Sequence, residues 1–536
     1  MSCTKKKFKR KDFRDFSDSD GFSIANDVRN LVLDFTPTSY PYTIEYVSEI
    51  VTADTAFLPV WFPQANYFTS FENLNFEITF PEDLGFRYKL VNFDTFSNNI
   101  AITNTSLKFE AKNITAIKRE ELMPNTLEVF PHIRMALTKF HLVGVDGQAS
   151  TWEELGTWMN EKLLSGTDEL SDATKVLIKK EVEGITDPIE KVKKVYQFVQ
   201  NKTRYVSIQL GIGGWKPMPA KDVDRLGYGD CKALTNYTRA LLKEVGIDAY
   251  YTVIYLDNDI ENIQRDFVSM QGNHAILAIP YKNEFIWAEC TSQTNPLNYQ
   301  AFSTDNRTAL VVTPTGGKII ETNMYVNDDN LKHTIAHIKL TPEGNISAQV
   351  QIKTAGNQMN RRLSLMRAEE KKKKEFYTKR FNAANGVRIS KMNIEFDESN
   401  MFVKETLDLT SENVITKAGK RIMLTPNWFT DMLSVPSKNR DRKYPLYIDR
   451  GYTDEESIQI TLPEGYKVEA IPAAVSETSI FGNYSMEYRV EGDNLIVHRK
   501  IQMKAGTHPK EQFEAYRLFV EKIVRNDNSK VVLIEL

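Results

Sequence analysis

The spacing of apolar residues along this chain changes twice, and the changes divide it into three parts. Up to about residue 150, short runs rich in β-branched and aromatic residues, such as Tyr42–Val47 and Phe76–Phe80, alternate with turn residues. From there to about residue 325, apolar residues recur first at helical spacing and then in continuous runs. A period of two then returns, as in Ile346–Ile352. These changes predict separate folding units of different class.

We therefore predict a multidomain α+β protein, and its 536 residues agree with a size prior of about three domains. Residues 1–150 and 321–536 are predicted to be antiparallel, β-sandwich-like domains. Residues 151–320 are predicted to form an α+β domain between them. One charged stretch in the last part, at about 361–384 with Lys371–Lys374, is predicted to be a helix with a solvated face.

The middle part carries clear signals for helix ends. Ser150-Thr151-Trp152-Glu153 is typical of a capping box, and Asp187-Pro188 supplies an N-cap followed by a proline in the first turn. A further helix is predicted to begin at Cys231 and to stop at Gly246. Three strand-like runs follow, at 249–255, 274–280 and 285–288.

Composition excludes several classes of protein. Lys and Arg number 68 against 71 Asp and Glu, so the net charge of −3 gives no electrostatic case for binding nucleic acid. No apolar run approaches the roughly 18 residues that a membrane-spanning helix needs. The three cysteines, Cys3, Cys231 and Cys290, form neither a disulfide framework nor a CxxC zinc pair. The basic stretch Lys5–Lys11 lacks the apolar region of a signal peptide, so the sequence as given predicts a soluble protein.

Cys231 is the first candidate for chemistry. It follows Gly227-Tyr228-Gly229-Asp230, where a glycine turn becomes an amphipathic helix, and backbone N–H groups with the helix dipole favour a thiolate there. His274 is the histidine in the same α+β part, at the start of a predicted strand, and Glu289 follows on the next strand. The order of cysteine, histidine and acid suits a nucleophile, its base and an orienting acid. Taken singly, His274 and Glu289 are equally consistent with ordinary residues at strand ends.

Three blocks of this part resemble the transglutaminase-like core of the cysteine peptidase and transglutaminase superfamily. They are Val192–Tyr205, Tyr228–Lys232, and Asn273-His274 with Trp287–Glu289. The stretch Tyr205–Pro217 is similar to bacterial proteins that place this core between an N-terminal β domain of unknown function and a C-terminal β domain. The resemblance implies a papain- or transglutaminase-like central domain.

The resemblance also implies roles for residues. Cys231 would be the nucleophile, His274 the general base and acid, and Glu289 the orienting acid, for acyl transfer or hydrolysis at an amide bond through a thioester. The Cys231 N–H would form part of an oxyanion hole, and Gln209 or Trp215 could supply the rest, although packing explains both more simply. Peptides, proteins or other amides are the expected substrates. This interpretation requires no metal and no organic cofactor.

Two departures from the superfamily leave an alternative open. Relatives more often have Asp at the position of Glu289, whose side chain is one methylene longer. Many relatives have proline at the position of Cys290, which we interpret as a buried, inert thiol. The alternative is a catalytically silent binding or scaffold protein that grips a peptide or glycan with its β domains. Relatives are also generally exported, so we expect either a shortened gene product or a start further upstream.

Overall fold

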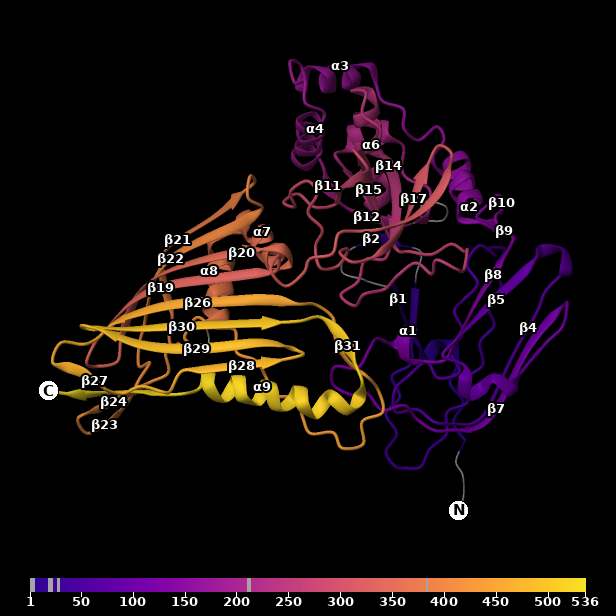
Figure 1. Cartoon of the computed structure of the whole chain (residues 1–536). Coiled ribbons are helices and arrows are strands. Elements are labelled where there is room, and N and C mark those ends of the chain that lie inside the picture. The colour runs from indigo at the N-terminus through magenta and orange to yellow at the C-terminus, as the bar shows by residue number, and fades with distance from the viewer. Residues whose placement is uncertain (1–4, 18–22, 27–28, 210–213, 382–383) are drawn as a thin grey trace.

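The N-terminal part packs two small antiparallel sheets face to face. The computed structural model describes residues 5–17, 23–26, 29–209, 214–381 and 384–536 (Figure 1). Phe109 and Leu107 of one sheet meet Ile133 and Met135 of the other in a buried core. The first sheet contains β4 (Phe71–Thr79), β7 (Ser106–Ile114) and β6 (Ile100–Ile102), and the second contains β5 (Phe86–Val91) and β8 (His132–Leu137).

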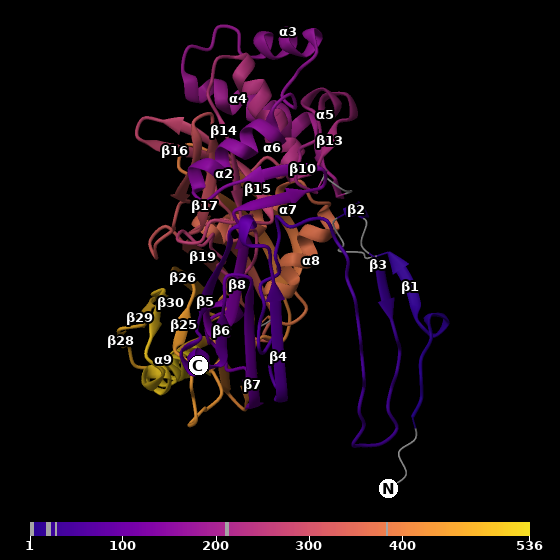
Figure 2. The ribbon, with the colours of Figure 1, turned by 90° about the vertical axis from the view of Figure 1, so that its right-hand side faces the viewer.

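The first strands of the chain lie outside these two sheets. β1 (Arg14–Ser17) pairs with β3 (Arg29–Val32), whereas β2 (Ser23–Asn26) pairs in parallel with β12 (Ser207–Gln209) of the middle part. In Figure 2 the chain around β1 and β3 stands apart from the sheets. The predicted strand at Tyr42–Val47 is wrong, because these residues carry no regular structure and Ile44, Tyr46 and Val47 are exposed. Alternation favours a strand only where a neighbouring strand offers hydrogen bonds.

The middle part consists of a five-stranded antiparallel sheet with helices packed against it. α6 (Cys231–Glu244) lies on β15 (His274–Tyr281), where Leu241 and Leu277 share a core with Val195 of α4 (Pro188–Lys202). The sheet order is β16 (Glu284–Ala288), β15, β14 (Tyr250–Ile254), β17 (Thr308–Thr313) and β18 (Gly316–Glu321). The other elements here are α2 (Trp152–Trp158), α3 (Asp172–Glu181), β11 (Arg204–Tyr205), α5 (Ala220–Leu226) and β13 (Tyr228–Gly229). β9 (Lys139–Leu142) and β10 (Val145–Gln148) form an antiparallel pair just before this part.

Helix starts in this part follow the sequence signals with one shift. Asp187 caps α4 and accepts from the N–H of Ile189 at 2.7 Å, as predicted. The cap of α2 is Thr151 rather than Ser150, since Thr151 accepts from the N–H of Glu154 at 3.1 Å. Ser150 and Thr151 each have a glutamate three positions later, so the capping-box pattern fits both; in the structure Thr151 pairs with Glu154, whose carboxylate accepts from the Thr151 N–H in return.

The C-terminal part is built on an eight-stranded sheet. Its core faces α8 (Glu370–Arg380), α9 (Phe513–Asp527) and a four-stranded sheet, all on one side (Figure 1). The large sheet has the order β21 (Arg388–Asp397), β22 (Phe402–Ser411), β20 (Ile346–Ala355), β19 (Leu331–Leu340), β26 (Tyr452–Thr461), β30 (Asn494–Met503), β29 (Gly482–Glu491) and β28 (Val475–Ser479). The small sheet has β23 (Thr416–Ala418), β24 (Arg421–Leu424), β32 (Val531–Glu535) and β27 (Tyr466–Ala470), and β25 (Leu446–Ile448) pairs with β31 (Gly506–His508).

Two expectations for this part need correction. β19 and β26 run parallel, so the large sheet is mixed rather than antiparallel throughout. The charged stretch at 361–384 forms two helices, α7 (Asn360–Met366) and α8, rather than one. The break occurs because Glu369 adopts an extended conformation as the N-cap of α8. Lys371 and Lys372 are exposed on α8, as a solvated face requires.

A buried network of charges joins α9 to the large sheet. Arg499 of β30 donates from Nε and Nη2 to the two oxygens of Asp527 at 2.6 and 2.8 Å, and from Nη1 to Glu456 at 2.9 Å. All three side chains are at most 1% exposed. Such a network is stable only while every charge keeps its partner.

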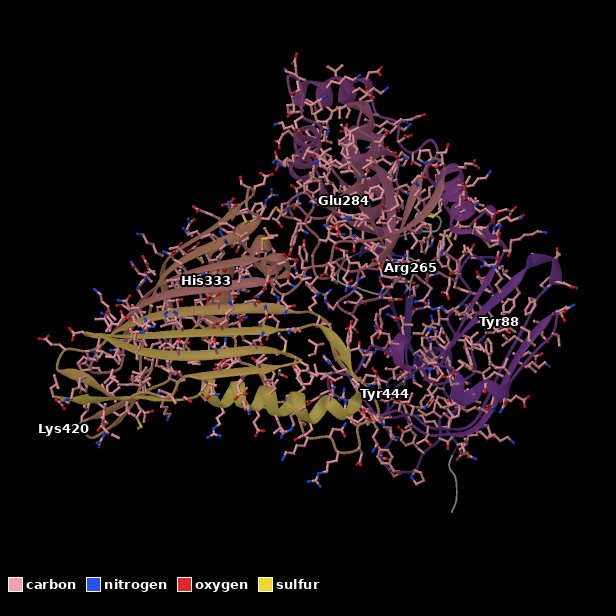
Figure 3. The ribbon with its side chains drawn as sticks, in the orientation of Figure 1. Tyr88, Arg265, Glu284, His333, Lys420 and Tyr444 are labelled. Atoms are coloured by element: carbon pink, nitrogen blue, oxygen red, sulfur yellow. The ribbon has the colours of Figure 1, made fainter. Side chains whose placement is uncertain are left out.

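The three parts are tied together by polar contacts. Arg442 of the C-terminal part donates to the carbonyl oxygens of Glu121 and Leu122 at 2.7 and 3.0 Å, and Figure 3 labels the nearby Tyr444. Arg450 pairs with Asp305 of the middle part at 2.5 Å. No helix among the described residues is long and apolar enough to cross a membrane.

Candidate active site

Cys231 is the first residue of α6, and its surroundings explain the glycines before it. Asp230 caps the helix by accepting from the N–H of Ala233 at 2.9 Å. Gly227 has φ of +68°, and a Cβ on Gly229 would lie 2.7 Å from the Cβ of Ala233. A side chain at Gly229 would therefore clash with the first turn of the helix. The turn places Cys231 at the positive end of the helix dipole, where 4% of the residue is exposed.

His274 and Glu289 come from the neighbouring ends of β15 and β16. His274 opens β15 after Asn273, whose side chain and backbone both bond back to the end of β14, at Leu256 and Ile254. Glu289 follows the last residue of β16. The distance from His274 Nε2 to Glu289 Oε2 is 2.9 Å, and only 7% and 10% of the two side chains are exposed. Glutamate therefore reaches the imidazole despite its additional methylene.

Cys231, His274 and Glu289 shift one another's pKa values toward their charged forms. Burial alone raises the pKa of the Cys231 thiol, but hydrogen bonding and charge interaction with His274 lower it below its usual value. Burial alone lowers the pKa of His274, but Glu289 and Cys231 raise it to about 10. Burial raises the pKa of Glu289, and His274 and Thr291 lower it further than burial raises it. Because Nε2 faces Glu289, Nδ1 is the nitrogen left for the thiol. These interactions shift the equilibrium of the pair toward a thiolate beside an imidazolium.

Cys290 has a different environment from Cys231. Its thiol is buried in the core between α6 and β15, and burial raises its pKa to about 12. Both cysteines are free. Cys3 lies outside the described residues. The prediction of an inert Cys290 agrees with this environment.

The structure describes the two oxyanion candidates unequally. Trp215 packs against the cluster that contains Cys231, and its ring contacts that of Phe57 of the N-terminal part in a tilted arrangement, with 4.1 Å between centroids. The backbone of Gln209 pairs with Asn26 in β2, but its side chain lies outside what the structure describes. Both oxyanion roles stay predictions.

Several contacts of the site were missed from the sequence. Thr291 donates to Glu289, Tyr196 donates to the Glu289 carbonyl oxygen at 2.8 Å, and Lys232 pairs with Asp230 at 2.5 Å. Thr291 stands two positions after Glu289, and a hydroxyl residue at that spacing from an acid is a weak sequence signal for a local hydrogen bond. Within the described residues, no group of three or more His, Cys, Asp or Glu side chains is arranged to hold a metal ion.

Family models match all three parts of the chain. Residues 177–292, which include Cys231, His274 and Glu289, match the model of the transglutaminase-like superfamily. Residues 3–118 and 420–533 match two domains of unknown function with solved structures, DUF3857 and DUF3858. This chain carries a transglutaminase-like domain between a DUF3857 domain and a DUF3858 domain. The predicted resemblance is thereby confirmed, while the boundaries at residues 150 and 320 stay predictions.

The solved structures that match this chain are distant from it in sequence. A "putative protease" from Parabacteroides distasonis has a TM-score of 0.52 and 12% identity over 89% of this chain and 75% of that chain. A "putative cysteine protease" from Cytophaga hutchinsonii aligns over 44% of this chain and 73% of that chain, with 15% identity and a TM-score of 0.19. No curated protein matches the chain. At such identities the first likeness bears on the fold alone, and it confirms the multidomain α+β prediction.

Proposed function

We propose that this protein is a cysteine-dependent enzyme that hydrolyses or transfers an acyl group at an amide bond through a thioester on Cys231. The observation that carries the proposal is the 2.9 Å contact between His274 Nε2 and Glu289 Oε2, beside a cysteine at a helix N-terminus. These residues have the order and chemistry of a nucleophile, a base and an orienting acid. Peptides, proteins or other amides are the proposed substrates.

The proposed reaction has two halves. The Cys231 thiolate attacks the carbonyl carbon, and the His274 imidazolium gives its proton to the leaving amine as the carbon–nitrogen bond breaks. The neutral imidazole then takes a proton from water or from a second amine, which attacks the thioester. This attack gives a tetrahedral intermediate, whose carbon–sulfur bond then breaks. The products are an acid or a new amide, and the thiolate and imidazolium are restored. Glu289 stays ionised throughout and holds the ring.

The alternative of a silent binding protein is favoured by one observation. Only 4% of Cys231 and 9% of His274 are exposed. Phe57 and Trp215 pack on the same cluster as Cys231, so a substrate requires this side of the site to open. The reactivity of Cys231 in solution separates the two functions.

Alkylation across pH tests the proposal directly. With iodoacetamide at pH 7, we expect Cys231 to react at least about ten times faster than Cys290. When the alkylation rate of Cys231 is plotted against pH, its midpoint should lie below the pKa of about 8.5 for free cysteine. The reason is that His274 stabilises the Cys231 thiolate, whereas burial raises the pKa of Cys290 to about 12. Mass spectrometry of the two cysteine peptides measures both rates.

Unfolded protein is the control for this comparison, since the two cysteines should then react at similar rates. Equal and slow labelling of Cys231 and Cys290 in the folded protein would contradict the enzyme and support the silent binding protein.

A further inference from the structure

The two oxygens of the Glu289 carboxylate have separate partners. Oε2 faces His274 Nε2 at 2.9 Å. Oε1 accepts two hydrogen bonds from Thr291, one from the backbone N–H at 3.1 Å and one from the side-chain hydroxyl at 2.5 Å. One residue thus satisfies the oxygen that does not face the imidazole.

The chain around Glu289 is itself fixed. Tyr196 of α4 donates its hydroxyl to the Glu289 carbonyl oxygen at 2.8 Å, and the N–H of Ser292 donates to the same oxygen at 3.2 Å. The backbone of Glu289 is therefore held by a helix and by its own turn. Only the side-chain torsions remain to be set, and glutamate has one more of them than aspartate.

We propose that Thr291 is a positioning residue that fixes the Glu289 carboxylate so that its other oxygen faces His274. The inference rests on the proposed function, because it assigns Thr291 a part in that catalytic cluster. The hydroxyl and N–H of Thr291 restrict the additional torsion that distinguishes Glu289 from the aspartate found more often in the superfamily. Thr291 acts through Glu289 and does not itself touch the reacting atoms.

The same hydrogen bonds favour the charged form of the carboxylate. A carboxylate that accepts several hydrogen bonds stays ionised even when buried. Its charge stabilises the imidazolium of His274, which in turn stabilises the Cys231 thiolate. The other titratable or charged groups around the cluster are Asp230, Lys232 and Tyr251 near Cys231, and Tyr196 and Cys290 near Glu289.

A pair of substitutions tests the role of the hydroxyl. Thr291→Val removes the Oγ1 donor and keeps the shape, whereas Thr291→Ser keeps the donor and removes a methyl group. We expect Thr291→Val to move the midpoint of Cys231 alkylation up by about 0.5 to 1 pH unit, and Thr291→Ser to leave it within about 0.2 unit. Should Thr291→Val fail to fold, Thr291→Ala provides the same comparison with Thr291→Ser.

A double variant shows whether Thr291 acts through Glu289. Glu289→Gln removes the charge that Thr291 orients, so adding Thr291→Val to it should cause no further shift in the midpoint. A Thr291→Val midpoint equal to that of the wild type, or an equal shift in the Glu289→Gln background, would overturn the proposal.

The alkylation profile needs no substrate, so the two proposals fail separately. If the wild-type protein turns over no amide but Thr291→Val shifts the midpoint while Thr291→Ser does not, the positioning role stands and the enzyme proposal fails. If the wild type is active and the midpoint of Thr291→Val is unchanged, only the positioning role fails.

Discussion

Replacement of Cys231 by alanine is expected to abolish amide hydrolysis and amine incorporation, with a loss of at least about 1000-fold. The reason is that the proposed pathway forms its thioester on this sulfur. Cys290 does not substitute, because it is buried in the core between α6 and β15 with its pKa raised to about 12. The change removes one atom from a buried position, so we expect a cost to stability of only about 1 kcal/mol.

Two assays on a panel of peptides and proteins measure this loss. Release of new amino groups or ammonia reports hydrolysis, and incorporation of a fluorescent primary amine reports transfer. Cys290→Ala is the matched control, because it removes the other buried thiol and should keep most of the activity. Activity retained by Cys231→Ala would remove this residue from the mechanism.

Replacement of Arg499 by methionine is expected to destabilise the protein by about 3–5 kcal/mol. Arg499 makes three hydrogen bonds, two to Asp527 and one to Glu456, and all three side chains are at most 1% exposed. Methionine fills much of the volume but removes the guanidinium that both buried carboxylates share. Glu456 is then left with Lys332 at 3.8 Å and Asp527 with the hydroxyl of Tyr484. The loss is therefore an electrostatic one rather than the loss of a packing contact.

The pH dependence of this variant follows from the same charges. Burial already raises the pKa of Glu456 in the intact protein, and removal of Arg499 removes a group that lowers it. A carboxyl group whose pKa is raised by folding becomes less destabilising as pH falls, because the folded state then binds the proton more tightly. The deficit of Arg499→Met should thus be smaller at pH 5 than at pH 7.

Urea unfolding at the two pH values measures both effects. Arg525→Met is the matched control: Arg525 is an exposed residue of α9, and its loss should change stability by no more than about 0.5 kcal/mol. A deficit for Arg499→Met below about 1 kcal/mol would show that the two carboxylates are not truly isolated from water.

The parts of the fold that could be predicted from the sequence have local causes. The helix at Cys231 follows a glycine turn and an aspartate cap, and the helix at Pro188 follows Asp187. The parallel pairing of β19 with β26 could not be predicted, because it joins residues well over a hundred positions apart, such as Leu331 and Thr453, and leaves no local pattern. The prediction of a strand at Tyr42–Val47 was wrong for a related reason. An alternating pattern is local, whereas a strand also needs a neighbouring strand to pair with.

The residues of the candidate site could be predicted from the sequence, but the geometry of Glu289 could not. Cys231, His274 and Glu289 were identified from residue type and order, and the structure brings them together. Whether a glutamate could reach the imidazole was not decidable from its position, because the answer depends on side-chain torsions. Those torsions are set by the two hydrogen bonds of Thr291, which depend on the shape of one turn.

The loop between β14 and His274 is held by residues outside the segment that matches the transglutaminase-like family. Lys89 of the N-terminal part pairs with Asp266 in this loop at 2.6 Å, and Asn125 donates to the carbonyl oxygen of Ile260 at 3.0 Å. Trp152 of α2 donates to the carbonyl oxygen of Arg265 at 2.7 Å, and Arg265 is labelled in Figure 3. An excised fragment of residues 177–292 would keep the cysteine, histidine and glutamate but lose these three tethers. Moved alone into another scaffold, the candidate site would therefore leave this loop without its contacts to α2 and to the flanking β domain.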